Sequence, residues 1–323
     1  MENRELLSIE KLLVCIKASG GRMYPAVDGI SLCMGKGEIL GLVGESGCGK
    51  SLTALATCGL LEGATVQCGG KIVFDGKELA SLTEKTRLEI YGRDIGMVFQ
   101  EPMTSLNPLM RIGEQVGEAL RLHSVLGRDA LDQQVERALA DVNLENPRAL
   151  MRKYPHELSG GMRQRVMIAS ATICHPKLLI ADEPTTALDV LTQEQVIGLL
   201  KKINAEYGTA ILFISHDLRL VSSLCARIAV MYAGKIVESG RTADVTGKPA
   251  HPYTKALLAA VPSRDKKGEM LDCIGGRVPA VTESKPPCPF APRCSRAQGV
   301  CFDRTPPDTE LSDGHRVACN FPL

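Results

Sequence analysis

The sequence lacks tryptophan and is poor in other aromatic residues, since its 323 residues include only six tyrosines and six phenylalanines. Proteins that bind single-stranded nucleic acid stack bases on aromatic side chains, so this scarcity argues against such a platform. A charge excess is lacking as well, because 38 basic residues face 37 acidic ones and the net charge is +1. No basic surface that would attract nucleic acid is indicated. We therefore expect no nucleic-acid partner.

Long hydrophobic runs are also absent. The longest apolar runs, such as Ile39–Val43 and Ala210–Ile214, fall far short of the roughly 20 residues that a membrane-spanning helix requires. The first residues, MENRELLSIEK, alternate charged and apolar side chains and contain no signal-peptide core. We therefore expect a chain that neither crosses a membrane nor is secreted.

Cysteine, by contrast, is plentiful, with twelve residues in two groups. We expect most members of the first group to be small buried side chains: Cys15, Cys33, Cys48, Cys58, Cys68, Cys174 and Cys225. The second group lies close to the C-terminus: Cys273, Cys288, Cys294, Cys301 and Cys319. Because nothing indicates export, a metal or cluster site is favoured over disulfides for this second group.

Apolar segments separated by glycines predict strands, whereas apolar residues at helical spacing predict helices from Ile112 to Leu150. From Pro176 onward strands and a helix alternate, which is typical of a mainly parallel sheet in an α/β fold. The later elements are expected at Leu178–Ala181, Thr192–Tyr207 and Ala210–Ser215, and the earlier strands at Ser31–Met34, Ile39–Val43, Lys71–Phe74 and Ile95–Phe99.

The length predicts about two domains. Proline becomes frequent after about Arg241, and the final stretch is too rich in proline for a helix or a central strand. We predict a first domain at residues 1–240, with a helical insertion at about 101–170, and a C-terminal extension at residues 241–323.

The segment GESGCGKS fits the phosphate-binding P-loop pattern G-x-x-x-x-G-K-S, and an expected strand precedes it. Its glycines let the backbone approach phosphates closely and point N–H groups at them. Lys50 is expected to reach the β- and γ-phosphates, and Ser51 to offer its hydroxyl to Mg²⁺. The expected nucleotide contacts are Gly44, Glu45, Ser46, Gly47, Cys48, Gly49, Lys50 and Ser51.

The segment LLIADEP is an apolar strand that ends in two acidic residues. Asp182, at the carboxyl end of the strand, suits a Mg²⁺ site. Glu183 is expected to polarise the attacking water as general base. Together with the P-loop, these residues predict a nucleotide-binding protein from the class that includes kinases, helicases, GTPases and transporters.

The segment LSGGMRQR, at residues 158–165, resembles the signature motif of the ABC ATPases, and the other motifs follow that family's order. Gln100 in MVFQEP matches the Q-loop, Asp189 in ALD the D-loop, and His216 in FISHD the switch histidine. The resemblance implies an α/β fold with a P-loop core and a mainly parallel sheet, an antiparallel β subdomain and an inserted helical subdomain, followed here by a small Cys/Pro-rich element. It also implies ATP hydrolysis in which Gln100 and His216 assist Glu183, with Gln100 also close to Mg²⁺.

The same resemblance implies that the signature acts across a head-to-tail dimer. A helix N-terminus favours anions, so the signature would cap the ATP held by the partner's P-loop. The residues concerned are Ser159, Gly160, Gly161 and Gln164. An aromatic residue is also implied to stack on adenine, and Tyr24 is the candidate because no other aromatic precedes the P-loop.

The segments HPYTKALLAAVP, CPFAPRC and GHRVAC resemble the tail of ATPases in dipeptide and oligopeptide ABC importers, a group that includes nickel importers. The resemblance implies a peripheral subunit on the cytoplasmic face of the cell membrane that uses ATP to drive peptide uptake. A nickel or metal-chelate importer is the alternative. The implied partners are a second, related ATPase in a heterodimer, two membrane permeases and, indirectly, an extracytoplasmic solute-binding protein.

Two other functions are weighed against import. A soluble ABC ATPase of DNA repair or translation usually has a long coiled-coil insertion or two cassettes in one chain, and neither occurs here. A regulatory protein with an inactive site is disfavoured because its catalytic residues would be replaced, whereas Lys50, Asp182, Glu183 and His216 are intact.

Cys288, Cys294, Cys301 and Cys319 are separated by five, six and seventeen residues, and no C-x-x-C pair of the zinc-ribbon kind occurs. Four thiolates suit either a structural zinc ion or an iron–sulfur cluster. The importer resemblance favours a four-iron four-sulfur cluster, because some members carry one in this tail, with zinc or no metal as alternatives. Cys273 lies outside this run and is left out of the predicted site.

Overall fold

The computed structural model describes residues 5–61, 63, 65–260 and 274–323, and its contacts divide the chain into two compact units. We call the first the helical unit, which comprises Met1–Leu6, Gly35–Glu38 and Ser81–Leu212. The second is the P-loop unit, which comprises Leu7–Met34, Ile39–Ala80 and Phe213–Leu323. This division follows contacts rather than chain order, and the predicted domain boundary after residue 240 stays a prediction.

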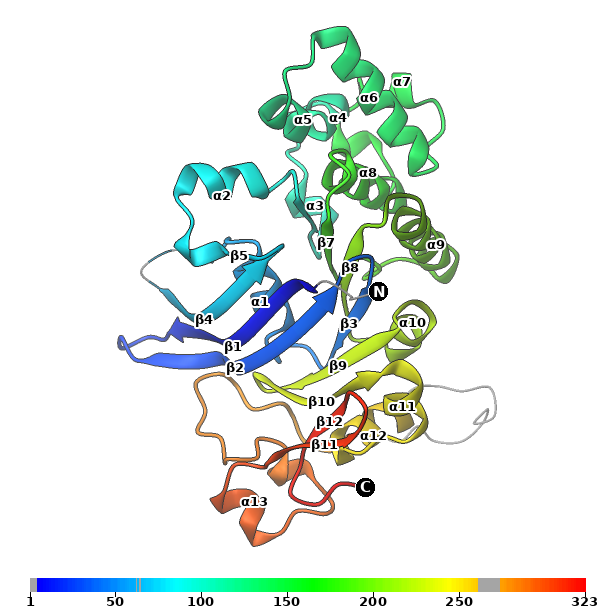
Figure 1. Ribbon diagram of the computed structural model, residues 1–323. Coiled ribbons are helices and arrows are strands. Elements are labelled where there is room, and N and C mark those ends of the chain that lie inside the picture. Colours follow the sequence, from blue (N-terminus) through cyan, green and yellow to red (C-terminus); the bar gives the residue numbers. More distant parts are fainter. Residues whose placement is uncertain (1–4, 62, 64, 261–273) are drawn as a thin grey trace. The chain divides into compact units, whose positions relative to one another are not determined.

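The helical unit contains the predicted helical stretch (green in Figure 1). In α6, Val135 and Leu139 are buried four residues apart, which is the spacing that places two side chains on one helix face. Helices α3, α4 and α6 all pack against α8. The helices of this unit are α2 (Glu84–Ile90), α3 (Pro102–Ser105), α4 (Ile112–Val116), α5 (Glu118–His123), α6 (Arg128–Asp141), α7 (Pro147–Leu150), α8 (Gly160–Thr172) and α9 (Val190–Tyr207).

Two strands of the helical unit, β6 (Ile95–Val98) and β7 (Leu178–Asp182), pair in parallel. Every residue of β7 is buried, as expected for a parallel strand that is covered on both faces. The strand β8 (Ala210–Ser215) is equally buried, and it begins in the helical unit and ends in the P-loop unit. The predicted parallel strands are therefore confirmed.

The P-loop unit contains an antiparallel sheet with the strand order β2-β1-β4-β5 (Figure 1). Strand β1 pairs with β4 from Leu7 opposite Phe74 to Ile16 opposite Val66, with a bulge between Glu10 and Leu13. This sheet confirms the antiparallel subdomain, although β1 was not predicted. Its strands are β1 (Glu5–Lys17), β2 (Met23–Gly35), β4 (Val66–Phe74) and β5 (Lys77–Glu78).

A second set of strands in the P-loop unit follows the order β11-β12-β10-β9-β3. Strands β3 and β9 are parallel, and the remaining neighbours are antiparallel. The C-terminal element, by which we mean the predicted extension at residues 241–323, therefore adds a β-hairpin to this sheet. The strands are β3 (Ile39–Val43), β9 (Arg227–Tyr232), β10 (Lys235–Arg241), β11 (Asp308–Ser312) and β12 (His315–Ala318), and the helices of the unit are α1 (Lys50–Thr57), α10 (Leu218–Leu224), α11 (Thr242–Gly247), α12 (Pro252–Ala259) and α13 (Gly299–Asp303).

Two observations concern the length of the helices and the burial of the cysteines. None of the helices within the described ranges is long and apolar enough to cross a membrane. The expectation that most of the seven scattered cysteines are buried is wrong, because only Cys48, Cys58 and Cys225 are buried whereas Cys33 and Cys68 are exposed. Alternation along β2 explains Cys33, since its neighbours on either side point into the core and it points to solvent.

Candidate functional site

The P-loop forms the turn between β3 and α1 in the P-loop unit. A Cβ atom at Gly44 would lie 2.1 Å from the carbonyl oxygen of Met231, and one at Gly49 would lie 2.9 Å from that of Ala26. Gly49 also has a φ of 109°, which side chains disfavour. The backbone of β9 at Met231 and of β2 at Ala26 therefore packs closely against the loop, and only glycine fits at Gly44 and Gly49.

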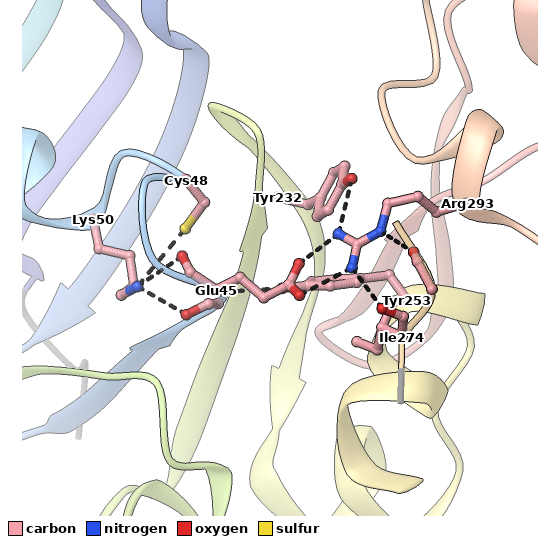
Figure 2. Close-up of polar contacts among 9 residues, drawn as sticks. Glu45, Cys48, Lys50, Tyr232, Tyr253, Ile274 and Arg293 are labelled. Carbon is pink, nitrogen blue, oxygen red and sulfur yellow. Dashed lines mark hydrogen bonds and ion pairs between the residues drawn. The ribbon is translucent and has the colours of Figure 1, made fainter. Parts of the chain in front are cut away.

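The Lys50 ammonium lies inside the P-loop (Figure 2). It donates hydrogen bonds to the carbonyl oxygens of Gly44 at 2.8 Å and Glu45 at 3.1 Å, and it lies 3.9 Å from the Cys48 sulfur. Burial raises the pKa of the Cys48 thiol, although the nearby ammonium opposes this shift. The loop thus concentrates positive charge and backbone N–H groups at the N-terminus of α1, which is the chemistry of a phosphate site.

Glu45 is held by two residues that sequence analysis missed. Its carboxylate forms a bidentate ion pair with Arg293, with N–O distances of 2.7 and 3.1 Å. Its backbone N–H donates a 3.0 Å hydrogen bond to the Tyr253 hydroxyl. The signal that was available in the sequence is the acidic residue itself, because a nearby cation favours an ionised carboxylate.

Two further predicted residues lie near the P-loop in the same unit. His216, which follows β8, lines a hollow of about 590 Å³ together with Glu45 and Ser46. Tyr24 lies on β2, two residues before Ala26, and the Arg22 guanidinium lies 5.2 Å from its ring centre. The roles predicted for His216 and Tyr24 stay predictions.

In the helical unit, Asp182 and Glu183 are buried at the carboxyl end of β7. The Glu183 carboxylate accepts hydrogen bonds from the Thr186 hydroxyl at 2.9 Å and from Gln100 Nε2 at 3.4 Å. The structure therefore brings Gln100 and Glu183 together, and Thr186 is a contact that sequence analysis missed. Glu183 has a φ of 46°, an unusual backbone conformation of the kind that clusters at functional sites.

The signature segment begins helix α8. The Ser159 side chain caps the helix by accepting from the backbone N–H of Met162 at 3.3 Å, and Ser159 and Gly160 are exposed. Gln164 differs from these residues, because its side chain is buried within the helical unit. Ser159 and Gly160 are therefore open to solvent, whereas the Gln164 side chain is not, and the role in trans predicted for the signature residues stays a prediction.

The D-loop residue Asp189 caps α9, where its carboxylate accepts from the backbone N–H and the hydroxyl of Thr192 at 3.0 and 2.7 Å. These two hydrogen bonds lower the pKa of Asp189. Thr192 also borders the signature, because a Cβ atom at Gly161 would lie 2.9 Å from its methyl group. The signature and the D-loop thus meet at Thr192.

The four predicted cluster cysteines line one small pocket of about 20 Å³ in the P-loop unit. Such a volume has room for about one water molecule. Burial raises the pKa of the Cys288 and Cys319 thiols. Within the part of the chain that the structure describes, no three or more His, Cys, Asp or Glu side chains are arranged to hold a metal ion. The arrangement does not support the predicted iron–sulfur cluster, and Cys273 lies outside the described residues.

Comparison with known proteins defines the class. Residues 27–186 match the ABC transporter family, and residues 237–301 match the C-terminal region of oligopeptide/dipeptide transporters. The chain is similar to a dimeric structure of the ATP-binding cassette MJ0796 in a post-hydrolysis state bound to ADP and Pi. The TM-score is 0.66 at 26% identity, over 73% of this chain and 99% of that one.

Full-length relatives narrow the class further. The oligopeptide transport ATP-binding protein OppD of Escherichia coli is 45% identical over 98% of this chain and 94% of its own length. The dipeptide transport ATP-binding protein DppD of Bacillus subtilis is 44% identical over the same shares. The chain therefore belongs to the ATP-binding subunits of ABC transporters, in the group with the oligopeptide/dipeptide C-terminal region, and it is an ATPase. The predicted family and fold class are confirmed.

Proposed function

We propose that this chain powers the uptake of dipeptides or oligopeptides through a membrane ABC importer. The observation that carries the proposal is that similarity to the oligopeptide and dipeptide transport proteins extends over 98% of the chain, the C-terminal region included. Nickel import, the alternative raised by the sequence, is not favoured by any relative reported above.

The proposed ATP site uses the P-loop backbone from Gly44 to Ser51, with Lys50 at the phosphates and Tyr24 at the adenine. We propose that oxygen atoms of Ser51, Gln100 and Asp182 surround Mg²⁺, which prefers such ligands and neutralises developing phosphate charge. The burial of Asp182 and the position of the Lys50 ammonium inside the loop support these roles.

Hydrolysis is assigned to Glu183 as general base, with Gln100 and His216 orienting the water and γ-phosphate. The support is local, since Thr186 and Gln100 both donate to the Glu183 carboxylate and fix its direction. Because the Glu183 carboxylate is already held in one orientation, it can accept the proton from water without a further loss of side-chain entropy.

We further propose that the chain works as a peripheral subunit on the cytoplasmic face of the membrane, paired head to tail with a second ATPase and bound to two permeases. An extracytoplasmic binding protein would deliver the solute. Exposed Ser159 and Gly160 at the start of α8 suit contact with ATP on the partner. The dimeric state of the similar cassette MJ0796 agrees with this arrangement.

Transport by the assembled importer tests the peptide assignment. The full chain, purified with its second ATPase and permeases, is placed in lipid vesicles with its binding protein, and ATP-dependent uptake of labelled dipeptides, longer peptides and Ni²⁺ is measured. We expect peptide uptake that disappears in Lys50→Ala. Uptake of Ni²⁺ without peptide would overturn the peptide proposal in favour of the alternative.

The four-iron four-sulfur cluster is kept as a separate proposal because Cys288, Cys294, Cys301 and Cys319 line one pocket, although the described thiols as they lie are not arranged to hold a metal ion. Because the pocket is small, the loops that carry these thiols must move apart to accept a cluster. Anaerobically purified protein should contain about four iron and four sulfide per chain, and Cys294→Ser should lose both. Stoichiometric zinc, or no metal at all, would rule the cluster out.

A further inference from the structure

The ion pair between Glu45 and Arg293 joins the P-loop to a residue 248 positions later in the chain (Figure 2). The side chains are 27% and 6% exposed, so the pair is mostly shielded from water. Both terminal nitrogens of Arg293 reach the carboxylate, and this two-bond geometry is the strongest form of an arginine–carboxylate contact. The hydrogen bonds with Glu45 raise the pKa of Arg293, so the guanidinium stays charged.

Arg293 also forms hydrogen bonds with residues other than Glu45. Its Nε donates to the carbonyl oxygen of Gly275 at 2.8 Å, and its terminal nitrogens donate to Ile274 O at 3.3 Å and to the Tyr232 hydroxyl at 3.2 Å. Every nitrogen of the guanidinium therefore has a partner. Arg293 ends a 3-10 turn that begins at Ala291, and the turn follows Phe290, which is buried and packs edge-on against Tyr232.

A second contact reaches the same P-loop residue from α12. Tyr253 is fully buried, and its hydroxyl accepts from the backbone N–H of Glu45. Burial raises the pKa of Tyr253, so the phenol stays neutral. The ring packs against Tyr232 and Phe290, with ring centres 4.7 and 5.3 Å apart. Main chain and side chain of Glu45 are thus both held by residues beyond position 250.

We propose that Arg293 and Tyr253 are positioning residues, through which the C-terminal element holds the P-loop in the shape that accepts nucleotide. Glu45 directly follows Gly44, and the carbonyl oxygens of both residues hold the Lys50 ammonium. Release of Glu45 would therefore loosen the lysine and the loop together. The proposal rests on the proposed nucleotide site at the P-loop and adds that its affinity depends on the C-terminal element.

Nucleotide binding to the full chain tests the proposal. Titration with fluorescent MgADP should give a Kd about tenfold weaker for Arg293→Ala, as expected if the loop holds its binding shape about a tenth of the time. Arg293→Lys should fall between, because an ammonium cannot form the two parallel bonds. Arg316→Ala is the matched control, since it removes an exposed ion pair with Asp308 in the same C-terminal element and should leave the Kd unchanged.

A double-mutant cycle separates positioning from general destabilisation. Glu45→Gln leaves the contacts of Arg293 with Tyr232 and Gly275 in place, so it tests the proposal even if Arg293→Ala unfolds the C-terminal element. We expect Glu45→Gln to weaken binding as Arg293→Ala does, and the double variant to be no weaker than either one. Additive losses would overturn the proposal.

Alkylation of Cys48, followed by mass spectrometry, gives a readout without nucleotide. Cys48 is fully buried in the P-loop, whereas Cys225 is buried away from it at the end of α10. Glu45→Gln should speed alkylation of Cys48 and not of Cys225. Equal acceleration at both cysteines would indicate general opening and would overturn the positioning role.

Lys50→Ala distinguishes failure of the two proposals. If Lys50→Ala binds MgADP as the wild type does, the proposed nucleotide site is wrong and the positioning role falls with it. If Lys50→Ala loses binding while Arg293→Ala and Glu45→Gln keep the wild-type Kd, only the positioning role is overturned.

Discussion

The P-loop and the signature are both helix N-termini suited to anions, yet their surroundings differ. The P-loop is held by its own unit, through the contacts of Glu45 with Arg293 and Tyr253 and the close packing at Gly44. The signature presents exposed Ser159 and open space at Gly160. Contacts within its own unit stabilise the conformation of the P-loop, whereas the signature exposes its backbone to solvent. This difference is what the proposed action on a partner's nucleotide requires.

The largest expected effect separates binding from chemistry. Glu183→Gln should lower ATP turnover by about 10²–10⁴-fold, because it removes the proposed general base. MgATP binding should be retained, since glutamine has nearly the same shape as glutamate and the proposed P-loop and Mg²⁺ contacts do not include Glu183. Phosphate release and nucleotide titration on the assembled importer measure the two quantities. Thr186→Val, which removes one donor to Glu183 and keeps its volume, should show a smaller loss of turnover. Near-normal turnover in Glu183→Gln would contradict the assignment.

The second prediction addresses the signature directly. Ser159→Arg should leave MgATP binding at this chain's own P-loop unchanged, because Ser159 is exposed and is not among the proposed contacts of that nucleotide. Turnover at the partner's site should fall by about 10²-fold, the usual cost of losing one preorganised donor.

The control for this prediction uses the hydrolysis-deficient background. Glu183→Gln should form a stable MgATP complex with the second ATPase, visible by size-exclusion chromatography, and addition of Ser159→Arg should prevent it. If Ser159→Arg instead lost binding to its own P-loop, the contrast between the two helix N-termini would be broken.

Sequence reasoning succeeded where the chemistry is contiguous. The P-loop and the acid pair Asp182–Glu183 lie within short segments flanked by apolar strands, so residue order alone places them. It failed where partners lie far apart, and Arg293 and Tyr253 had no local feature that linked them to Glu45. The hairpin strand β11 was missed because all its residues are exposed, which leaves no alternation to detect.

A matched glycine pair tests how tightly the signature is packed on the D-loop side. Gly161→Ala should destabilise the protein by about 1–3 kcal/mol, because its new methyl group would overlap the Thr192 methyl group and Thr192 cannot rotate without losing its bond to Asp189. Gly160→Ala meets no atom within 4 Å and, since alanine favours helix, should change stability by less than about 1 kcal/mol.

Chemical unfolding of the two alanine variants measures this difference in stability. Far-UV circular dichroism checks that both variants keep the helix content of the wild type. Equal stability of the two variants would show that the signature is as loosely held at Gly161 as at Gly160. The loosely packed part of the signature would then extend to the D-loop, and the difference in packing between the signature and the P-loop would be larger than the structure indicates.

The smallest expected effect is a pH dependence at Asp189. Hydrogen bonds from Thr192 lower the pKa of Asp189 below its usual 3.8 in the folded state, so the unfolded chain binds the proton more readily. The stabilisation is therefore fully present above pH 3.8 and is lost as the pH falls through the folded-state pKa. Asp189→Asn keeps a good helix cap without the charge, so the wild type should melt slightly higher at neutral pH. This difference in Tm should vanish in acid, whereas a difference that persisted at low pH would mean that the charge of Asp189 does not stabilise the D-loop.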